Sequence, residues 1–178
     1  VLDAVESCFD TNPNPAARAA LRCLADRGGA YMEIHGREPA LRDMHEALEL
    51  ARRENDEELL GEFLMNIGLA YARLDDDKPK ALAYYDEALS IARRRKDNGL
   101  LNPLLNNSAN QLRDLRQWGE AERRYLEAVA LGGRSGPNSA YPLKNLGIVY
   151  RETGRARQAE QVLLEALALA DRQGTGRI

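Results

Sequence analysis

Aromatic residues are scarce in this sequence of 178 residues, at 6% of the total, with two Phe and one Trp. The chain is rich in Ala, Leu, Arg and Glu, which favour helices, and poor in the β-branched and aromatic residues that favour strands. The composition therefore excludes a strand-rich fold and predicts an all-α protein.

Cysteines and long apolar runs are also scarce. The two cysteines, Cys8 and Cys23, are too few for a disulfide framework or a zinc knuckle, and we expect both to be buried or semi-buried apolar side chains. We therefore expect a reducing, cytoplasmic environment. No run of 18 apolar residues occurs, so the sequence predicts no membrane span and no membrane partner.

An excess of positive charge is missing, since 25 Lys and Arg stand against 28 Asp and Glu, for a net charge of −3. General nucleic-acid binders usually carry a basic excess, so we expect this segment to bind no nucleic acid. The basic run Arg93–Lys96 ends a predicted helix, where cations offset the helix dipole.

Catalytic and metal-binding side chains do not gather anywhere in the sequence. The two histidines, His35 and His45, have no acidic triplet near them, and Cys23 has no histidine at catalytic spacing in its helix. We therefore predict no catalytic residues, no metal and no cofactor, and we expect a protein that is not an enzyme.

What the sequence does contain is a pattern that occurs four times. A small residue recurs at intervals of 40, 41 and 38 residues, with Leu four positions before it and Tyr or Leu three positions after it. The small residues are Gly28, Gly68, Ala109 and Gly147. In a helix, residues at this spacing lie on one face.

A second helical segment follows each small residue. It carries two alanines seven residues apart, with Met, Tyr or Leu between them. The first alanine comes twelve residues after the small residue, or thirteen in the second copy; the pairs are Ala40/Ala47, Ala81/Ala88, Ala121/Ala128 and Ala159/Ala166. Helix axes approach closely only where small residues meet. We therefore expect each copy to be an antiparallel helix hairpin, with Gly68 lying opposite Ala81.

Local signals predict where the helices begin and end. Asn102-Pro103 is typical of an N-cap followed by Pro in the first turn, and Asn55 precedes an acidic first turn. Pro39 and Pro79 are expected to start second helices, while Asn98-Gly99 and Gly132-Gly133 are expected to end them.

The spacing Leu-x3-Gly-x2-Tyr followed by Ala-x3-Tyr-x2-Ala-Leu resembles the tetratricopeptide repeat over about residues 15–173. The period here is near 40 residues, longer than the 34 residues usual for this repeat. In this it is similar to repeats in kinesin light chains and bacterial signalling proteins. The resemblance implies a right-handed superhelical solenoid of about four antiparallel hairpins, lined inside by the first helices. One departure is that Arg52, Arg93, Gly133 and Asp171 replace the usual Pro near the end of each second helix.

We predict a single array over residues 1–178, with repeats at about 15–54, 55–97, 100–133 and 138–173. Residues 1–10 resemble the tail of a preceding second helix, and we expect a fragment of a larger protein. Val162 and Leu164 are apolar where the first copy has Asp43 and His45, so we expect them on an exposed, apolar end of the array, suited to self-association as a homo-oligomer.

The resemblance places a peptide or protein partner in the groove. Asn66, Asn107 and Asn145 stand in register, and a carboxamide both donates and accepts hydrogen bonds. These asparagines either grip the main chain of an extended peptide or bond locally within the array. The full set of groove candidates is Asn66, Leu69, Asn107, Asn110, Arg113, Lys144, Asn145, Ile148 and Arg151.

Two functions follow as hypotheses. The first is a non-catalytic scaffold that binds a peptide or protein segment in the concave groove. The second is a self-associating or ligand-sensing segment of a larger bacterial transcriptional or signalling regulator.

Overall fold

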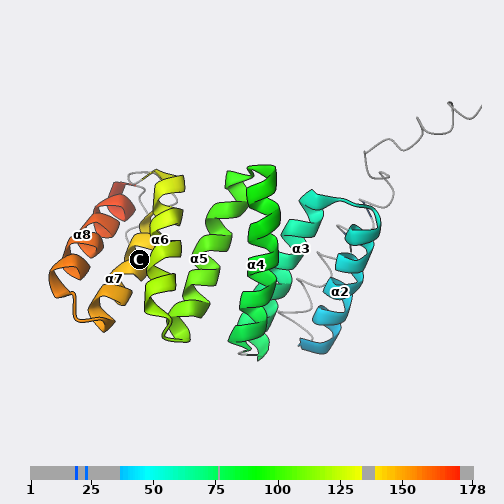
Figure 1. The fold of residues 1–178 in the computed structure, drawn as a ribbon, viewed down its shortest axis with the longest axis horizontal. Coiled ribbons are helices and arrows are strands. Elements are labelled where there is room, and N and C mark those ends of the chain that lie inside the picture. The colour runs from blue at the N-terminus through cyan, green and yellow to red at the C-terminus, as the bar shows by residue number, and fades with distance from the viewer. Residues whose placement is uncertain (1–18, 20–22, 24–36, 76, 134–138, 173–178) are drawn as a thin grey trace, which may run out of the picture.

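The computed structural model describes residues 37–75, 77–133 and 139–172, together with residues 19 and 23. This part of the chain is helical and contains no strand, which confirms the all-α prediction. Figure 1 shows the helices side by side along the long axis. They are α2 (Arg37–Arg53), α3 (Glu57–Ala70), the π-helix η2 (Tyr71–Asp75), α4 (Lys78–Arg95), α5 (Asn98–Asp114), α6 (Trp118–Gly132), α7 (Ala140–Glu152) and α8 (Ala156–Arg172). The predicted tail at 1–10 and most of the first helix of the first copy lie outside the described residues.

The helices stack as successive hairpins. Helix α3 packs against α4, α5 against α6 and α7 against α8, while α4 contacts α5 and α6 contacts α7. Helix α5 also contacts both α3 and α7. The first helices thus pack on one another and form the inner row of the array. The predicted solenoid of antiparallel hairpins is confirmed, and we call the surface of α3, α5 and α7 the concave face.

Small residues allow the close approach of paired helices, as the sequence predicts. A Cβ atom on Gly68 would lie 2.8 Å from Cε1 of Tyr85 and 3.2 Å from the carbonyl oxygen of Ala81. The alanines Ala81, Ala88, Ala121 and Ala128 are 0% exposed. The predicted contact between Gly68 and Ala81 is therefore confirmed. The corresponding contact of Gly28 lies outside the described residues.

The second copy accommodates its extra residue as a π-helix. The thirteen-residue interval between Gly68 and Ala81 contains η2, which continues α3 directly. A π-turn takes up one additional residue without breaking the helix. The helix that follows therefore keeps its register, and Tyr85 is fully buried like Tyr125 of the next copy.

Aspartates cap three successive helices. The side chains of Asp56, Asp77 and Asp97 accept hydrogen bonds from the backbone N–H three residues on, at 3.1, 3.1 and 3.0 Å. Asn55 and Lys96, which precede two of these aspartates, have φ values of 53° and 56°. Non-glycine residues thus supply the left-handed position that ends a helix, and the next aspartate starts the following one.

Several predicted helix boundaries are therefore wrong. Asn55 takes the left-handed position before the true cap, Asp56. Asn98-Gly99 begins α5 instead of ending α4, and Asn102-Pro103 lies inside α5, where Asn102 donates to the Ala128 carbonyl at 2.7 Å. The Asn-Pro pair has the composition of a cap, but Asp97 starts the helix earlier. Pro79 at the start of α4 and Gly133 at the end of α6 are confirmed.

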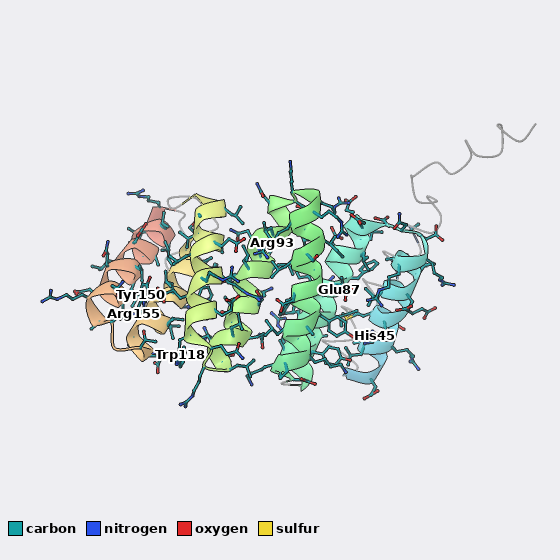
Figure 2. The ribbon with its side chains drawn as sticks, in the orientation of Figure 1. His45, Glu87, Arg93, Trp118, Tyr150 and Arg155 are labelled. Atoms are coloured by element: carbon teal, nitrogen blue, oxygen red, sulfur yellow. The ribbon has the colours of Figure 1, made fainter. Side chains whose placement is uncertain are left out.

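Ion pairs connect successive second helices on the outer face. They are made by two of the residues that replace the family's usual proline. Arg52 of α2 donates to Glu87 of α4 at 3.0 Å, and Arg93 of α4 donates to Glu127 of α6 at 2.9 Å. Figure 2 shows Glu87 and Arg93 projecting from α4. These side chains are well exposed, so each ion pair contributes at most about 1 kcal/mol. The pairs mainly fix the register of neighbouring units.

Candidate functional site

Three adjoining depressions follow the concave face. The methionine pocket, about 430 Å³, lies between α3 and α5; it is lined by Glu62, Met65, Asn66, Asp97, Gly99, Leu100 and Pro103. The proline pocket, about 400 Å³, lies between α5 and α7; it is lined by Gly99, Asn102, Pro103, Asn106, Asn107, Tyr141 and Pro142. The arginine pocket, about 370 Å³, lies toward the carboxyl ends of these helices; it is lined by Leu69, Ala72, Arg73, Tyr85, Asn107, Asn110, Gln111, Arg113, Asp114 and Asn145. Shared lining residues join the three into one groove.

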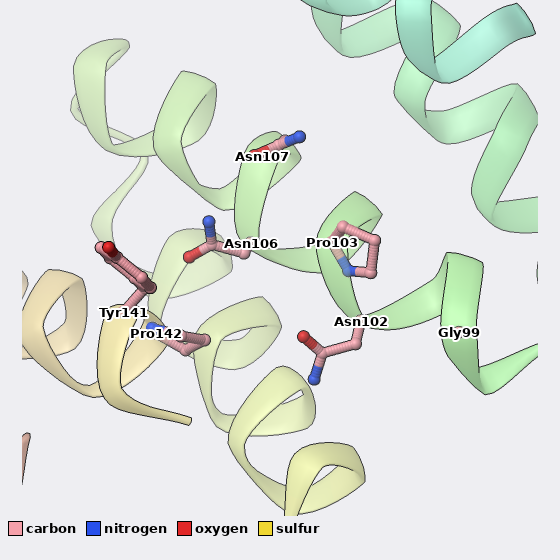
Figure 3. Close-up of a pocket in the computed structure, with 7 residues that line it drawn as sticks. All are labelled: Gly99, Asn102, Pro103, Asn106, Asn107, Tyr141 and Pro142. Carbon is pink, nitrogen blue, oxygen red and sulfur yellow. The ribbon is translucent and has the colours of Figure 1, made fainter. Parts of the chain in front are cut away.

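The proline pocket combines apolar walls with carboxamides. Figure 3 shows Tyr141 and Pro142 on one side, Asn102 and Pro103 on the other, and Asn106 between them. Tyr141 is 61% exposed, so its ring is open to a ligand. Pro103 lacks an N–H, so the Gly99 carbonyl loses its usual helical donor at the pocket wall. The pocket thus offers an exposed aromatic ring, carboxamides and a backbone acceptor.

The predicted asparagines behave in two different ways. Asn110 accepts from the Tyr125 hydroxyl at 2.6 Å and from Nδ2 of Asn145 at 3.1 Å; Nδ2 of Asn145 also donates to Asn106 at 3.2 Å. These carboxamides tie α5 to α6 and α7. In contrast, no side chain in the described part of the chain bonds the carboxamides of Asn66 or Asn107. Local bonding therefore accounts for Asn110 and Asn145, and Asn66 and Asn107 are open to the groove.

The charged groups of the arginine pocket are unevenly paired. Nη2 of Arg113 donates to Asp114 on the same helix at 2.8 Å. Among the residues that the structure describes, no acidic side chain pairs with Arg73, which is exposed at the rim. Counted over the described residues alone, Arg73 therefore leaves one positive charge without an acidic partner in this part of the groove.

The structure brings together six of the nine predicted groove residues. Asn66 lines the methionine pocket, and Leu69, Asn107, Asn110, Arg113 and Asn145 line the arginine pocket. Lys144, Ile148 and Arg151 line none of the three pockets, and Arg151 pairs with Glu152 at 2.9 Å. Sequence reasoning did not identify Pro103, Asn106 and Tyr85 as groove residues. A proline well inside a helix was the available signal for the first of these.

The predicted apolar end face needs a correction. Val162 is 6% exposed because it lies on the side of α8 that packs against α7, in the same cluster as Leu143 and Leu146. Leu164 is exposed as predicted, at 60%, and Leu167 at 51% was not foreseen. Leu89 and Val129, which hold the position of Leu167 in earlier units, are only 3% and 4% exposed.

The remaining polar clusters have a structural character. Burial, together with nearby Lys80, lowers the pKa of His45, and its Nε2 lies 3.3 Å from the Tyr71 hydroxyl. Tyr71 stacks on Tyr84 with ring centroids 5.5 Å apart.

No group of three His, Cys, Asp or Glu side chains suited to a metal occurs within the described ranges. Cys23 is a free thiol and is exposed, so its predicted burial is wrong.

The stacked hairpins and their groove define a class, the all-α helical-repeat solenoids. A family model described as tetratricopeptide repeat matches residues 100–172, which confirms the predicted tetratricopeptide-type repeat over this part of the chain. A second model, described as anaphase-promoting complex subunit 5, matches residues 26–67 and 62–114 in two successive stretches. No curated protein sequence matches the chain.

Solved structures share this fold at low sequence identity. Aspartyl phosphate phosphatase F from Bacillus subtilis is 16% identical, with a TM-score of 0.77 over 89% of this chain and 42% of its own length. A Rap protein complexed with Competence and Sporulation Factor is 17% identical, with a TM-score of 0.76 over 89% of this chain and 44% of its own. BtubC (BKLC) from P. vanneervenii is 19% identical, with a TM-score of 0.62 over 89% and 75%. The chain thus spans less than half the length of the first two.

None of the helices in the described part of the chain has the length and apolar character that crossing a bilayer needs.

Proposed function

We propose that this chain is a non-catalytic scaffold that binds an extended peptide or protein segment along the groove of α3, α5 and α7. The observation that carries the proposal is the continuity of the three pockets, with Asn107 shared between the proline and arginine pockets. The match of residues 100–172 to a tetratricopeptide repeat model supports it, since helical-repeat arrays offer extended concave binding surfaces. A solved Rap protein of this fold is complexed with Competence and Sporulation Factor.

The groove chemistry suits a main chain better than a small molecule. Its three pockets are open and adjoining, as an extended segment requires. The carboxamides of Asn66 and Asn107 can each donate to and accept from a peptide bond. Tyr141 supplies apolar area to a side chain of the partner while keeping its hydroxyl in water. The partner we propose is thus read mainly through its backbone.

The chemistry of the whole chain supports a protein partner in the cytoplasm. The net charge of −3 gives no broad attraction to nucleic acid. The two cysteines of the chain are too few for a disulfide framework, as is usual in a reducing compartment.

Replacing Asn107 with alanine is expected to weaken peptide binding about fivefold, because one hydrogen bond to the ligand is lost. A library of short random peptides is selected on the wild-type protein, and the affinity of a retained peptide is measured by fluorescence anisotropy. The melting temperature should stay unchanged, because Asn107 bonds no described side chain.

The matched control is Asn98→Ala, which removes a carboxamide from the same helix outside the three pockets and should leave affinity unchanged. Retention of no peptide by the wild-type protein would contradict the proposal. Equal loss of affinity in both variants would place the binding surface elsewhere.

A second candidate function is self-association through α8. It is supported by the exposure of Leu164 and Leu167, at 60% and 51%. The combined change Leu164→Glu and Leu167→Glu is expected to convert a dimer to a monomer, because two charges would be buried in an apolar contact. Light scattering over a range of protein concentrations measures this. A wild-type protein that stays monomeric throughout the range counts against the candidate.

A further inference from the structure

A cluster of aromatic and basic side chains joins α2 to the unit that follows it. His45 of α2 lies beside Tyr71 of η2 and Tyr84 of α4, with ring centroids 6.2 and 5.9 Å away. The two tyrosine rings stack on each other. The ammonium of Lys80, also on α4, lies 4.1 Å from the centre of the Tyr71 ring. We call these four side chains the His45 cluster.

Lys80 fixes the direction of the hydrogen bonds in the His45 cluster. A hydrogen bond with the Tyr71 hydroxyl raises the pKa of Lys80. An ammonium group has donors and no acceptor, so the Tyr71 oxygen accepts this bond. The hydroxyl proton of Tyr71 is then directed to Nε2 of His45, 3.3 Å away. Nε2 of His45 is therefore an acceptor, which requires a neutral imidazole with its proton on Nδ1.

Protonation of His45 would remove this acceptor. An imidazolium carries an N–H on both ring nitrogens, so Nε2 would become a second donor toward a hydroxyl that already accepts from Lys80. The new charge would also be half-buried and close to the Lys80 ammonium. Burial first, and then the charge of Lys80, lowers the pKa of His45 below its ordinary value. The cluster is thus built for a neutral histidine.

The other charged groups near His45 do not reverse this preference. On α2 itself, Glu49 raises the pKa of His45 and Arg52 lowers it. Arg52 donates to Glu49 at 2.8 Å and to Glu87 of α4 at 3.0 Å, so both carboxylates already have a cationic partner. Burial raises the pKa of Tyr84, which keeps that hydroxyl neutral. Among the described residues, no acidic group is therefore free to hold a charged His45 in place.

The cluster adds a polar contact to the apolar packing of α2. Helix α2 contacts α3, and Met44 and Leu48 belong to the same core cluster as Leu59 of α3. The His45 cluster attaches α2 to η2 and α4 as well. Separation of one unit from an array costs less free energy than global unfolding. A loss of this contact therefore affects first the separation of α2 from the second unit.

We propose that the His45 cluster is an acid-sensitive contact, through which the first unit opens from the second when His45 gains a proton. The proposal does not depend on what the groove binds. Because the pKa of His45 is lower in the folded protein, the open state takes up the proton first as the pH falls. The contact is thus at full strength above about pH 6.5, the ordinary pKa of histidine, and weakens as the pH falls toward the lower folded value.

Hydrogen exchange followed by mass spectrometry tests this on the whole chain. Exchange in α2 is measured at about pH 7.5 and about pH 5.5, where Asp and Glu stay largely ionised. The rates are corrected for the intrinsic effect of pH on exchange. The opening constant of α2 is expected to rise about threefold at the lower pH. The opening constants of α7 and α8, which contain no histidine, should not change.

Three variants assign the effect to this cluster. His45→Gln is expected to abolish the pH dependence, because a carboxamide oxygen can accept from Tyr71 at either pH. Lys80→Gln is expected to reduce the pH dependence, because the neighbouring cation is lost. The matched control is His35→Gln, which replaces the chain's other histidine and should keep the full pH dependence.

Two results would overturn the proposal. One is exchange in α2 that is equal at both pH values in the wild-type protein. The other is a pH dependence that survives His45→Gln and disappears in His35→Gln. If His45→Gln does not fold, NMR titration of the wild-type histidines decides, with the resonances assigned through His35→Gln. A pKa of His45 at or above about 6.5 would then refute the acid-sensitive contact.

Discussion

Replacing Gly68 with valine is expected to lower the free energy of unfolding by about 3 kcal/mol. Even the first added carbon would lie 2.8 Å from the ring of Tyr85 and 3.2 Å from the Ala81 carbonyl. Tyr85 is fully buried, so its ring has no free space to move into. The two methyl groups of valine would therefore push α3 and α4 apart.

Urea denaturation followed by circular dichroism measures the loss. Gly119→Ala is the control, because a Cβ there meets nothing within 4 Å. Gly119 lies in the first turn of α6, where alanine favours the helix, so this variant should be unchanged or slightly more stable. A Gly68→Val protein as stable as the wild type would show that α3 and α4 do not approach as closely as described.

The second large effect is expected at Asn110. Replacing Asn110 with leucine is expected to lower the free energy of unfolding by about 2 kcal/mol. The side-chain oxygen of Asn110 accepts from the Tyr125 hydroxyl at 2.6 Å and from Asn145 at 3.1 Å. Leucine has a similar volume but no acceptor, so the Tyr125 hydroxyl would lose its acceptor and the Asn145 amide would lose one of its two acceptors.

The reciprocal change tests the same interaction in the opposite direction. Leu69 holds the position of Asn110 one repeat earlier, and the buried Tyr85 hydroxyl has no hydrogen-bond partner among the described residues. Leu69→Asn introduces the missing acceptor beside Tyr85 and is expected to raise the free energy of unfolding by about 1 kcal/mol. The two variants should therefore move the urea midpoint in opposite directions. A shift in the same direction for both would show that residue size, not hydrogen bonding, decides stability at this position.

The architecture was predictable because its determinants repeat along the chain. The spacing of Leu, a small residue and Tyr predicted one packing face on each first helix. Paired alanines such as Ala81 and Ala88 predicted the matching face on a second helix. Both sets are buried as expected. Four copies of one local pattern were sufficient to predict an array of antiparallel helix hairpins.

Helix boundaries were less predictable because several residues nearby could serve as caps. Asn102-Pro103 has the composition of a helix start, yet Asp97 starts the helix and Asn102 bonds the Ala128 carbonyl instead. The bonding of the candidate site residues was also difficult to predict. Asn107 and Asn145 look equivalent in the sequence, but only Asn145 has acceptors in the preceding repeat.

The sequence by itself determined the fold and the faces on which paired helices pack, because a helical period is a local property that can be read from spacing. Only the tertiary structure decided which side chains line the pockets and which of them are engaged in hydrogen bonds. Asn145 reaches acceptors 39 and 35 residues away in the chain, and the corresponding positions beside Asn107 and Tyr85 hold Met65 and Leu69. A hydrogen bond needs both partners at bonding distance, and only the packing of successive repeats brings them there.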